Sequence, residues 1–305
     1  WTTIGTVNGT STGIGKALVI DLNTNADQTN VAAVLNALSF RSTSDNPTLN
    51  NTDTTRAYSI RINDGNNNNL AGGAGEASQD SNTLTGIITI TPDNDLPVVD
   101  LNGASAGDDI SDTWTEGSNT AHTTITLAAA ATLADVDNAN LSQMQLAVAG
   151  LHDGNNEVLN IGGTNFPMAT AANSVDVGIF LVSYDPSATT FTIVPDGSSI
   201  TTKANFQSLL QGIKYINTTD NPTDGDRTVT VSVSDAGLLD TTTINGAASS
   251  AATATVITIN VDPVNDQPVI TALNAVSFFE NAINATAAVI DGDITLTDID
   301  SADYA

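Results

Sequence analysis

Apolar and polar residues alternate along several short stretches of the chain. In residues 228–234 every second residue is Val, with Thr or Ser between, and residues 58–62 and 257–261 follow the same period. Successive side chains of a strand point to opposite faces, so this period predicts antiparallel sheets with one buried face. Clusters of Gly, Asn, Asp and Pro separate the stretches and indicate turns.

Helical periodicity is confined to two segments, DQTNVAAVLNALSF (27–40) and TKANFQSLLQGIKY (202–215). Each segment allows a helix of a turn or two. The predicted fold class is therefore all-β, with tandem Ig-like β-sandwich domains and short helical inserts.

The chain also repeats itself. Three pairs of segments match at an offset of 171–175 residues: 35–48 with 210–223, 56–65 with 227–237, and 88–99 with 259–270. A Leu-x-Asp-x-Asp pattern, preceded by a Glu and a strand, ends at Asp137 and again at Asp300. The repeat predicts the C-terminal part of one unit at 1–96, a complete unit at 97–267 and the front of a third at 268–305. We expect the chain to be a window on a longer protein.

The charge balance narrows the classes of partner. The chain has 34 acidic and 7 basic residues, a formal net charge of -27 and no Cys. Nucleic acids and anionic membrane surfaces need clustered Lys and Arg, so both are excluded as partners, whereas bound cations would relieve the self-repulsion. Without Cys there are no disulfides and no thiolate metal sites. No stretch is apolar enough to insert into a membrane, and the N-terminus is no signal peptide.

The segment NGTSTGIGKAL (8–18) has the glycine spacing of a short-chain dehydrogenase loop. Such a loop needs a helix after it, whereas KALVIDLNTN (16–25) has the pattern of a short strand ending in turn residues. No Tyr is followed four residues later by Lys. We predict a Gly- and Thr-rich hairpin, and no enzyme.

Three further motifs are incomplete. GGAGEASQD (72–80) resembles a calcium-binding nonapeptide but occurs once, and DNPTDGDR (220–227) lacks the spacing of an EF-hand. His122 and His152 are isolated, which disfavours a zinc site or a Ser/His/Asp hydrolase.

Acidic residues recur where strands end. An up-and-down path through the complete unit, with residues 122–132 as one strand of about 33 Å, separates them into two groups. The N-terminal junction is predicted to gather Asp93, Asn94, Asp95, Asp135, Asp137 and Asp235. The C-terminal junction is predicted to gather Glu116, Asp224, Asp226, Asn265, Asp266, Asp298 and Asp300, and Asp262 is a further candidate ligand.

Carboxylates packed this closely repel each other unless a hard cation bridges them. Ca²⁺ accepts six to eight oxygen ligands in irregular geometry, so it is the predicted cofactor. The alternative is that these Asp and Asn residues cap turns and solvate loops.

Several of these motifs together resemble a known family. VTVSVSDAG…ATVITINVDPVNDQPVI looks like the last two strands and linker of a cadherin repeat, and Glu280, Asp298 and Asp300 follow at matching spacing. With TEGS…LADVDNANL and YINTTDNPTDGDR, the chain resembles the cadherin-like tandem repeats of giant bacterial surface adhesins, including RTX-type adhesins. The resemblance implies an extracellular location and calcium between domains, with Glu280 among the ligands.

The sequence departs from the cadherin pattern in three ways. Pro263 stands where an Asp would precede VND, and Asp262 lies one residue earlier. The Leu-Asp-Arg-Glu motif is absent, and we assign its role to Asp224 and Asp226. The unit is longer than a cadherin repeat, so residues 141–205 are expected to add strands.

The preferred hypothesis is a calcium-stiffened extender that holds a terminal adhesive domain away from the cell, with neighbouring repeats as its partners. Two alternatives stay open. The repeats could bind a carbohydrate or another copy of the chain through Phe166, Phe180, Tyr184 and Phe191, although their alternation also suits a core. Alternatively, copies could assemble into a homopolymeric filament.

Overall fold

The computed structural model describes residues 2–49, 52–65, 78–118, 121–197, 201–235, 254–301 and 303. The chain divides into two compact units, residues 1–47 and 48–305, which are described separately. Residues 72–77 of the nonapeptide-like segment 72–80 lie outside the described residues.

The first unit contains a hairpin and a helix. Strands β1 (Gly5–Thr12) and β2 (Leu18–Leu22) pair antiparallel, and α1 (Gln28–Asn36) follows. Gly13 and Gly15 have φ of 84° and 66°, a region that favours glycine, in the turn between the strands. The glycines thus serve a hairpin, as predicted, because a strand and not a helix follows them.

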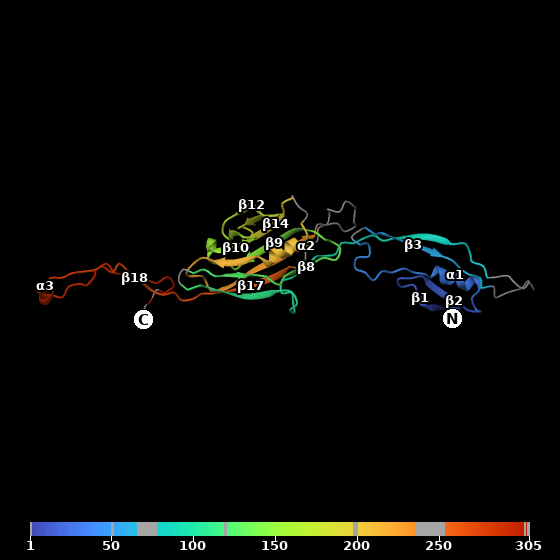
Figure 1. Ribbon diagram of the computed structural model, residues 1–305, viewed down its shortest axis with the longest axis horizontal. Coiled ribbons are helices and arrows are strands. Elements are labelled where there is room, and N and C mark those ends of the chain that lie inside the picture. Colours follow the sequence, from blue (N-terminus) through green and yellow to red (C-terminus); the bar gives the residue numbers. More distant parts are fainter. Residues whose placement is uncertain are drawn as a thin grey trace, which may run out of the picture. The chain divides into compact units, whose positions relative to one another are not determined.

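The second unit holds most of the secondary structure (Figure 1). Its strands are β3 (Thr55–Ile60), β4 (Leu84–Thr89), β5 (Val98–Asp100), β6 (Ile110–Thr115), β7 (Thr124–Thr126), β8 (Thr132–Ala134), β9 (Leu141–Ala149), β10 (Glu157–Ile161), β11 (Thr164–Pro167), β12 (Ala172–Val177), β13 (Phe180–Asp185), β14 (Thr190–Pro195), β15 (Lys214–Asn217), β16 (Gly225–Asp235), β17 (Thr255–Asp262), β18 (Val269–Thr271) and β19 (Thr295–Thr297). Its helices are η1 (Gly154–Asn156), α2 (Lys203–Gln211) and α3 (Glu280–Ala285).

Two sheets enclose one core. A seven-stranded sheet has the order β12-β13-β14-β9-β16-β17-β6, and a four-stranded sheet has the order β11-β10-β15-β7. The alternation in β16 acts as predicted, since Val229, Val231 and Val233 are at most 1% exposed. The all-β sandwich with short helical inserts is therefore confirmed. One pairing differs from the antiparallel expectation, because β6 runs parallel to β17.

The aromatic residues of the 141–205 insert belong to this core. Phe166, Phe180, Tyr184 and Phe191 are all buried, and the Tyr184 and Phe191 rings stack with centroids 4.2 Å apart. The insert does add strands, as expected. Its aromatics form no exposed face, so the hypothesis that they bind a carbohydrate is wrong.

Residues 122–132 do not form one strand. β7 pairs with β15 in the four-stranded sheet, whereas β8 pairs with β5 in a separate two-stranded sheet. Between them the chain turns, with the Ala131 N–H donating to the Ala128 carbonyl at 3.0 Å. The Gln211 side chain of α2 donates to the Ala131 carbonyl at 2.7 Å, which satisfies a backbone group that the turn leaves unpaired.

Segments that match in sequence adopt matching structures. Helices α1 and α2 are both nine residues long and begin 175 residues apart. In the hairpin β3–β4, Arg56 pairs with Ile88, and 171 residues later Arg227 of β16 pairs with Ile259 of β17. The pair β18–β19 likewise repeats the register of β5–β8. The repeat is therefore structural, while the domain boundaries after 96 and 267 stay predictions.

Candidate cation-binding junctions

Polar side chains gather where the linker after β4 meets the end of β8 and the end of β16. This N-terminal cluster consists of Asn94, Asp95, Asp135, Asp137, Asn138 and Asp235. The Asn94 Nδ2 donates to Asp235 Oδ2 at 2.7 Å, and the Asn138 Nδ2 donates to Asn94 Oδ1 at 2.8 Å. The backbone N–H of Asp95 donates to Asp137 Oδ2 at 3.0 Å. The structure thus brings together residues far apart in the sequence, as expected.

Asp135 is the buried member of the N-terminal cluster, with 8% of its surface exposed. Its Oδ1 accepts the backbone N–H groups of Asp137 and Asn138 at 3.1 and 2.7 Å, which forms a turn directly after β8. Burial, with Asp137 beside it, raises the pKa of Asp135 to about 7. The N-terminal cluster therefore disfavours the ionised form of Asp135 beside Asp137 when only protein groups surround it.

A second cluster lies where β6 and β17 end and the next linker begins. This C-terminal cluster consists of Glu116, Asp220, Asp266, Asp298 and Asp300. Because β6 runs parallel to β17, Glu116 follows its strand at the same end as Asp262, and its N–H donates to the Asp262 carbonyl at 3.0 Å. Glu116 Oε2 accepts the Val264 N–H at 3.0 Å, so its carboxylate turns toward the linker.

Glu116 is 5% exposed, and its Oε1 has no hydrogen-bond partner among the described residues. Burial raises the pKa of Glu116, and the nearby charges of Asp266, Asp220 and Asp300 raise it further. In the described residues, Asp220 Oδ1 and Asp300 Oδ1 are also buried oxygens without a hydrogen-bond partner. Most buried polar groups are hydrogen-bonded, so three buried carboxylate oxygens in one cluster that lack a partner among the described residues need a physical explanation.

The two clusters share one backbone arrangement. The Asp95 N–H donates to Asp137, and 171 residues later the Asp266 N–H donates to Asp300 Oδ2 at 2.8 Å. Asp298 Oδ1 also accepts the Ser301 N–H at 3.2 Å, as Asp135 Oδ1 does for Asn138. Each linker is therefore tied through one backbone N–H to the second Asp of an Asp-x-Asp pair.

Some predicted ligands do not join the clusters. Asp224 and Asp226 are exposed, and Asp226 Oδ1 accepts the Asn260 side chain at 3.0 Å across the strand pair β16–β17. The side chains of Asp93, Asp262, Asn265 and Glu280 are exposed as well. Glu280 lies at the start of α3, and Asp262 contributes its carbonyl to Glu116 rather than its carboxylate.

Two cluster members were missed by the sequence reasoning. Asp220 belongs to the Asp-Asn-Pro-Thr stretch that occurs at 45–48 and again at 220–223. This repetition of an acid before Pro was the available signal. Asn138 is the second missed member, and its place directly after Asp137 is the signal that could have identified it.

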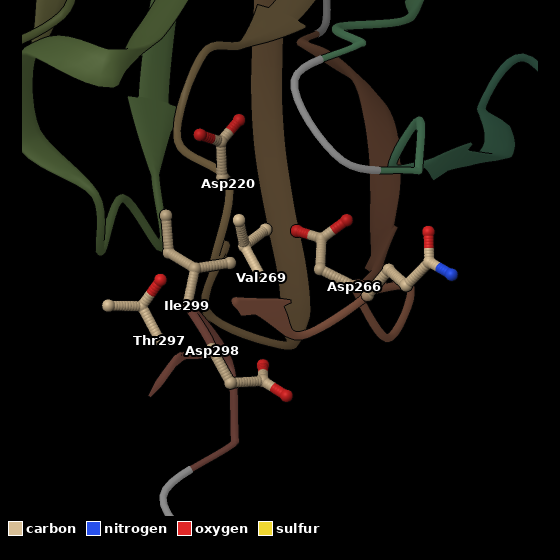
Figure 2. A pocket seen from close by; sticks show the side chains of 7 residues that line it. Asp220, Asp266, Val269, Thr297, Asp298 and Ile299 are labelled. Carbon is tan, nitrogen blue, oxygen red and sulfur yellow. The ribbon is translucent and has the colours of Figure 1, made fainter. Parts of the chain in front are cut away.

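Residues of the C-terminal cluster line a pocket with Val269, Thr297, Ile299 and Gln267. Figure 2 shows the Asp220 carboxylate from the loop before β16 and the Asp266 carboxylate from the linker after β17, while the Asp298 carboxylate points away from both. Across the described ranges, no three His, Asp or Glu side chains already stand in an arrangement that would hold a metal ion. Carboxylates would have to turn toward a shared cation.

Comparisons with known proteins leave the family open. No family model matches the chain, and no curated protein matches it. Among solved structures, the human desmocollin-1 ectodomain is similar with a TM-score of 0.20 and 11% identity over 72% of this chain. The chain spans 29% of that ectodomain, and a TM-score this low supports no further argument. None of the helices in the described ranges has the length and apolar character needed to cross a membrane.

Proposed function

We propose that the chain is a structural segment of an extracellular repeat array, and that Ca²⁺ binds at both junctions and stiffens them. The observation that supports this most directly is the Glu116 carboxylate, which is buried beside three other carboxylates and keeps one oxygen without a hydrogen-bond partner in the part of the chain that the structure describes. A turn or a solvated loop gives no reason to bury such a group.

The chemistry of the clusters suits a hard cation. An ionised carboxylate in a buried place is costly unless a positive charge or several donors compensate it. The raised pKa values of Glu116 and Asp135 express that cost. The available ligands are carboxylate, amide and carbonyl oxygens without His or Cys, a set that favours Ca²⁺ over zinc. Mg²⁺ fits less well, because it prefers few protein ligands and several waters.

At the C-terminal junction the proposed ligands come from both sides of the linker, whereas at the N-terminal junction they come from the linker and from the unit that follows it. At the C-terminal junction they are Glu116, Asp266, Asp298 and Asp300. At the N-terminal junction they are Asn94, Asp95, Asp135, Asp137 and Asp235. A cation shared by such residues would oppose bending at the linker, since bending would separate ligands that one ion holds. Together with the resemblance to cadherin-like repeats of bacterial adhesins, this favours an extender that projects an adhesive domain.

The first test is thermal unfolding of the chain in millimolar Ca²⁺ and in excess chelator. Binding to the folded state alone adds about 2.7 kcal/mol at a hundredfold excess over Kd, so we expect a clear calcium-dependent rise in Tm. The controls are Mg²⁺ at equal ionic strength and the double variants Asp135→Asn/Asp137→Asn and Asp298→Asn/Asp300→Asn. Each variant should remove part of the rise. Equal Tm values in calcium and chelator would contradict the proposal.

A further inference from the structure

Among the described residues, a network of buried charges lies inside the sandwich. Arg227 of β16 is fully buried, and its Nε donates to Glu157 Oε1 at 2.6 Å. Its Nη2 donates to Asp153 Oδ2 at 3.1 Å. The Tyr215 hydroxyl donates to Glu157 Oε1 at 2.9 Å. Buried ion pairs seldom stabilise a fold more than apolar residues would, so a role beyond packing is worth seeking.

Asp153 extends this network to the loop that connects β15 to β16. The backbone N–H of Thr223 donates to Asp153 Oδ2 at 3.1 Å, and the Thr223 Oγ1 donates to Asp153 Oδ1 at 2.7 Å. The Asn217 Nδ2 donates to Asp153 Oδ2 at 2.7 Å. One carboxylate, itself fixed by Arg227, therefore fastens both ends of the loop Asn217–Thr223.

The middle of that loop faces the C-terminal junction. Asn217 Oδ1 accepts the Thr219 N–H at 3.1 Å, and Pro222 is buried, which further restricts the loop. The Asn221 Nδ2 reaches the Ile299 carbonyl, between Asp298 and Asp300, at 3.3 Å. Asp220 stands between these anchored residues and lines the same pocket as Asp266 and Asp298 (Figure 2).

We propose that Asp220 is a further ligand of the cation at the C-terminal junction, and that Asp153, Arg227 and Thr223 are positioning residues that hold its loop in place. This inference rests on the proposed function. Two observations carry it beyond a cluster of acids. Glu116 is buried in the same cluster with Oε1 lacking a partner among the described residues, and Asp220 Oδ1 is buried in the same condition.

The arrangement has a physical purpose. Several carboxylates repel each other before a cation arrives, so a flexible loop would carry Asp220 away from Glu116. A loop fastened to the core keeps the ligand near its binding position, and the ordering cost is met in folding instead of in binding. Outer groups that orient ligands typically change metal affinity by about 10–100-fold when they are removed.

The test is calorimetric titration of the full chain with CaCl₂, in a background of Asp135→Asn/Asp137→Asn that leaves the C-terminal junction intact. Asp220→Asn should weaken calcium binding at least tenfold, because it removes the ligand charge. Thr223→Val removes only the hydroxyl bond to Asp153 and should weaken binding about three- to tenfold. Thr223→Ser restores the hydroxyl and should bind as the background does.

A matched control separates positioning from general stability. Thr170 Oγ1 donates to Asn155 Oδ1 at 2.8 Å in the same sandwich, outside the network, so Thr170→Val should leave calcium affinity unchanged. Denaturation in chelator measures the stability of each variant. If Thr223→Val lowers stability but not affinity, or if Asp220→Asn binds normally, this inference is overturned and the proposed function survives. If the unsubstituted chain binds no calcium, both are overturned.

Discussion

At the scale of single residues, Asp135 shows the conflict between charge and burial. It is 8% exposed, and burial beside Asp137 raises its pKa to about 7, above the 3.8 of an exposed aspartate. A raised pKa means that the folded state binds a proton more tightly than the unfolded state. Without a cation, folding stability from this residue is therefore present at low pH and is lost as the pH rises toward 7.

This sign predicts an unusual effect of Asp135→Asn in chelator. The amide keeps an oxygen for the Asp137 and Asn138 N–H groups but carries no charge. Each pKa unit corresponds to about 1.4 kcal/mol, so we expect stabilisation of about 1–3 kcal/mol at pH 8 and little change at pH 4. Urea denaturation at the two pH values measures it. In calcium the same substitution should destabilise, since a ligand charge is lost. If Asp135→Asn is destabilised equally at both pH values in chelator, the ionised Asp135 carboxylate does not destabilise the folded state.

At the scale of elements, β16 carries Arg227 of the buried network, and β3 carries Arg56, the residue that matches Arg227 in the repeat. Arg227 is fully buried between Glu157 and Asp153, whereas Arg56 pairs with Asp53 at 2.8 Å with 32% of its side chain exposed. Arginine at matching positions of the two hairpins is therefore partly exposed in β3 and fully buried in β16. The difference follows from the neighbours, because β10 supplies Glu157 opposite β15 in the four-stranded sheet.

The two arginines give a matched pair of substitutions. Arg227→Met leaves two buried carboxylates without their cation and should cost about 3–5 kcal/mol of unfolding free energy. Arg56→Met removes an exposed pair and should cost less than about 1 kcal/mol. Near-ultraviolet circular dichroism during urea unfolding reports both, with the fully buried Trp114 as one probe of the sandwich core. Equal costs would mean that the network contributes no more than a surface ion pair.

At the scale of the whole molecule, the two junctions repeat one arrangement at the two ends of the sandwich. Each ties a linker N–H to the second Asp of an Asp-x-Asp pair. If each junction binds calcium, the number of stiffened linkers grows with the number of repeats. An array would then respond as a whole to extracellular calcium, although each site acts locally.

Small-angle X-ray scattering tests this at low protein concentration. We expect a larger maximum dimension and a narrower range of conformations in millimolar calcium than in chelator, because bridged junctions resist bending. Glu116→Gln/Asp300→Asn should abolish the part of the change that belongs to the C-terminal junction. Mg²⁺ at equal ionic strength controls for charge screening, which alone would make an acidic chain more compact. Identical scattering in calcium and chelator would contradict stiffening even if calcium binds.

The sequence by itself determined the features that depend on local pattern. Alternation in 228–234 predicted the buried face of β16, the glycines of 8–18 predicted a hairpin, and the two helical segments appear as α1 and α2. The repeated Leu-x-Asp-x-Asp pattern matched Asp135 with Asp298, and in the structure each accepts through Oδ1 the backbone N–H three residues later. These features follow from side-chain period, turn chemistry and internal repetition, which are readable within a short window.

Only the tertiary structure decided which segments meet. It paired β6 parallel to β17, divided 122–132 between two sheets and buried Arg227 against Glu157, 70 residues away in the chain. It also replaced the predicted Asp224 and Asp226 by Asp220 in the C-terminal cluster. An Asp in a turn looks the same in sequence whether it faces water or other carboxylates. Its environment depends on long-range packing, which no local pattern encodes.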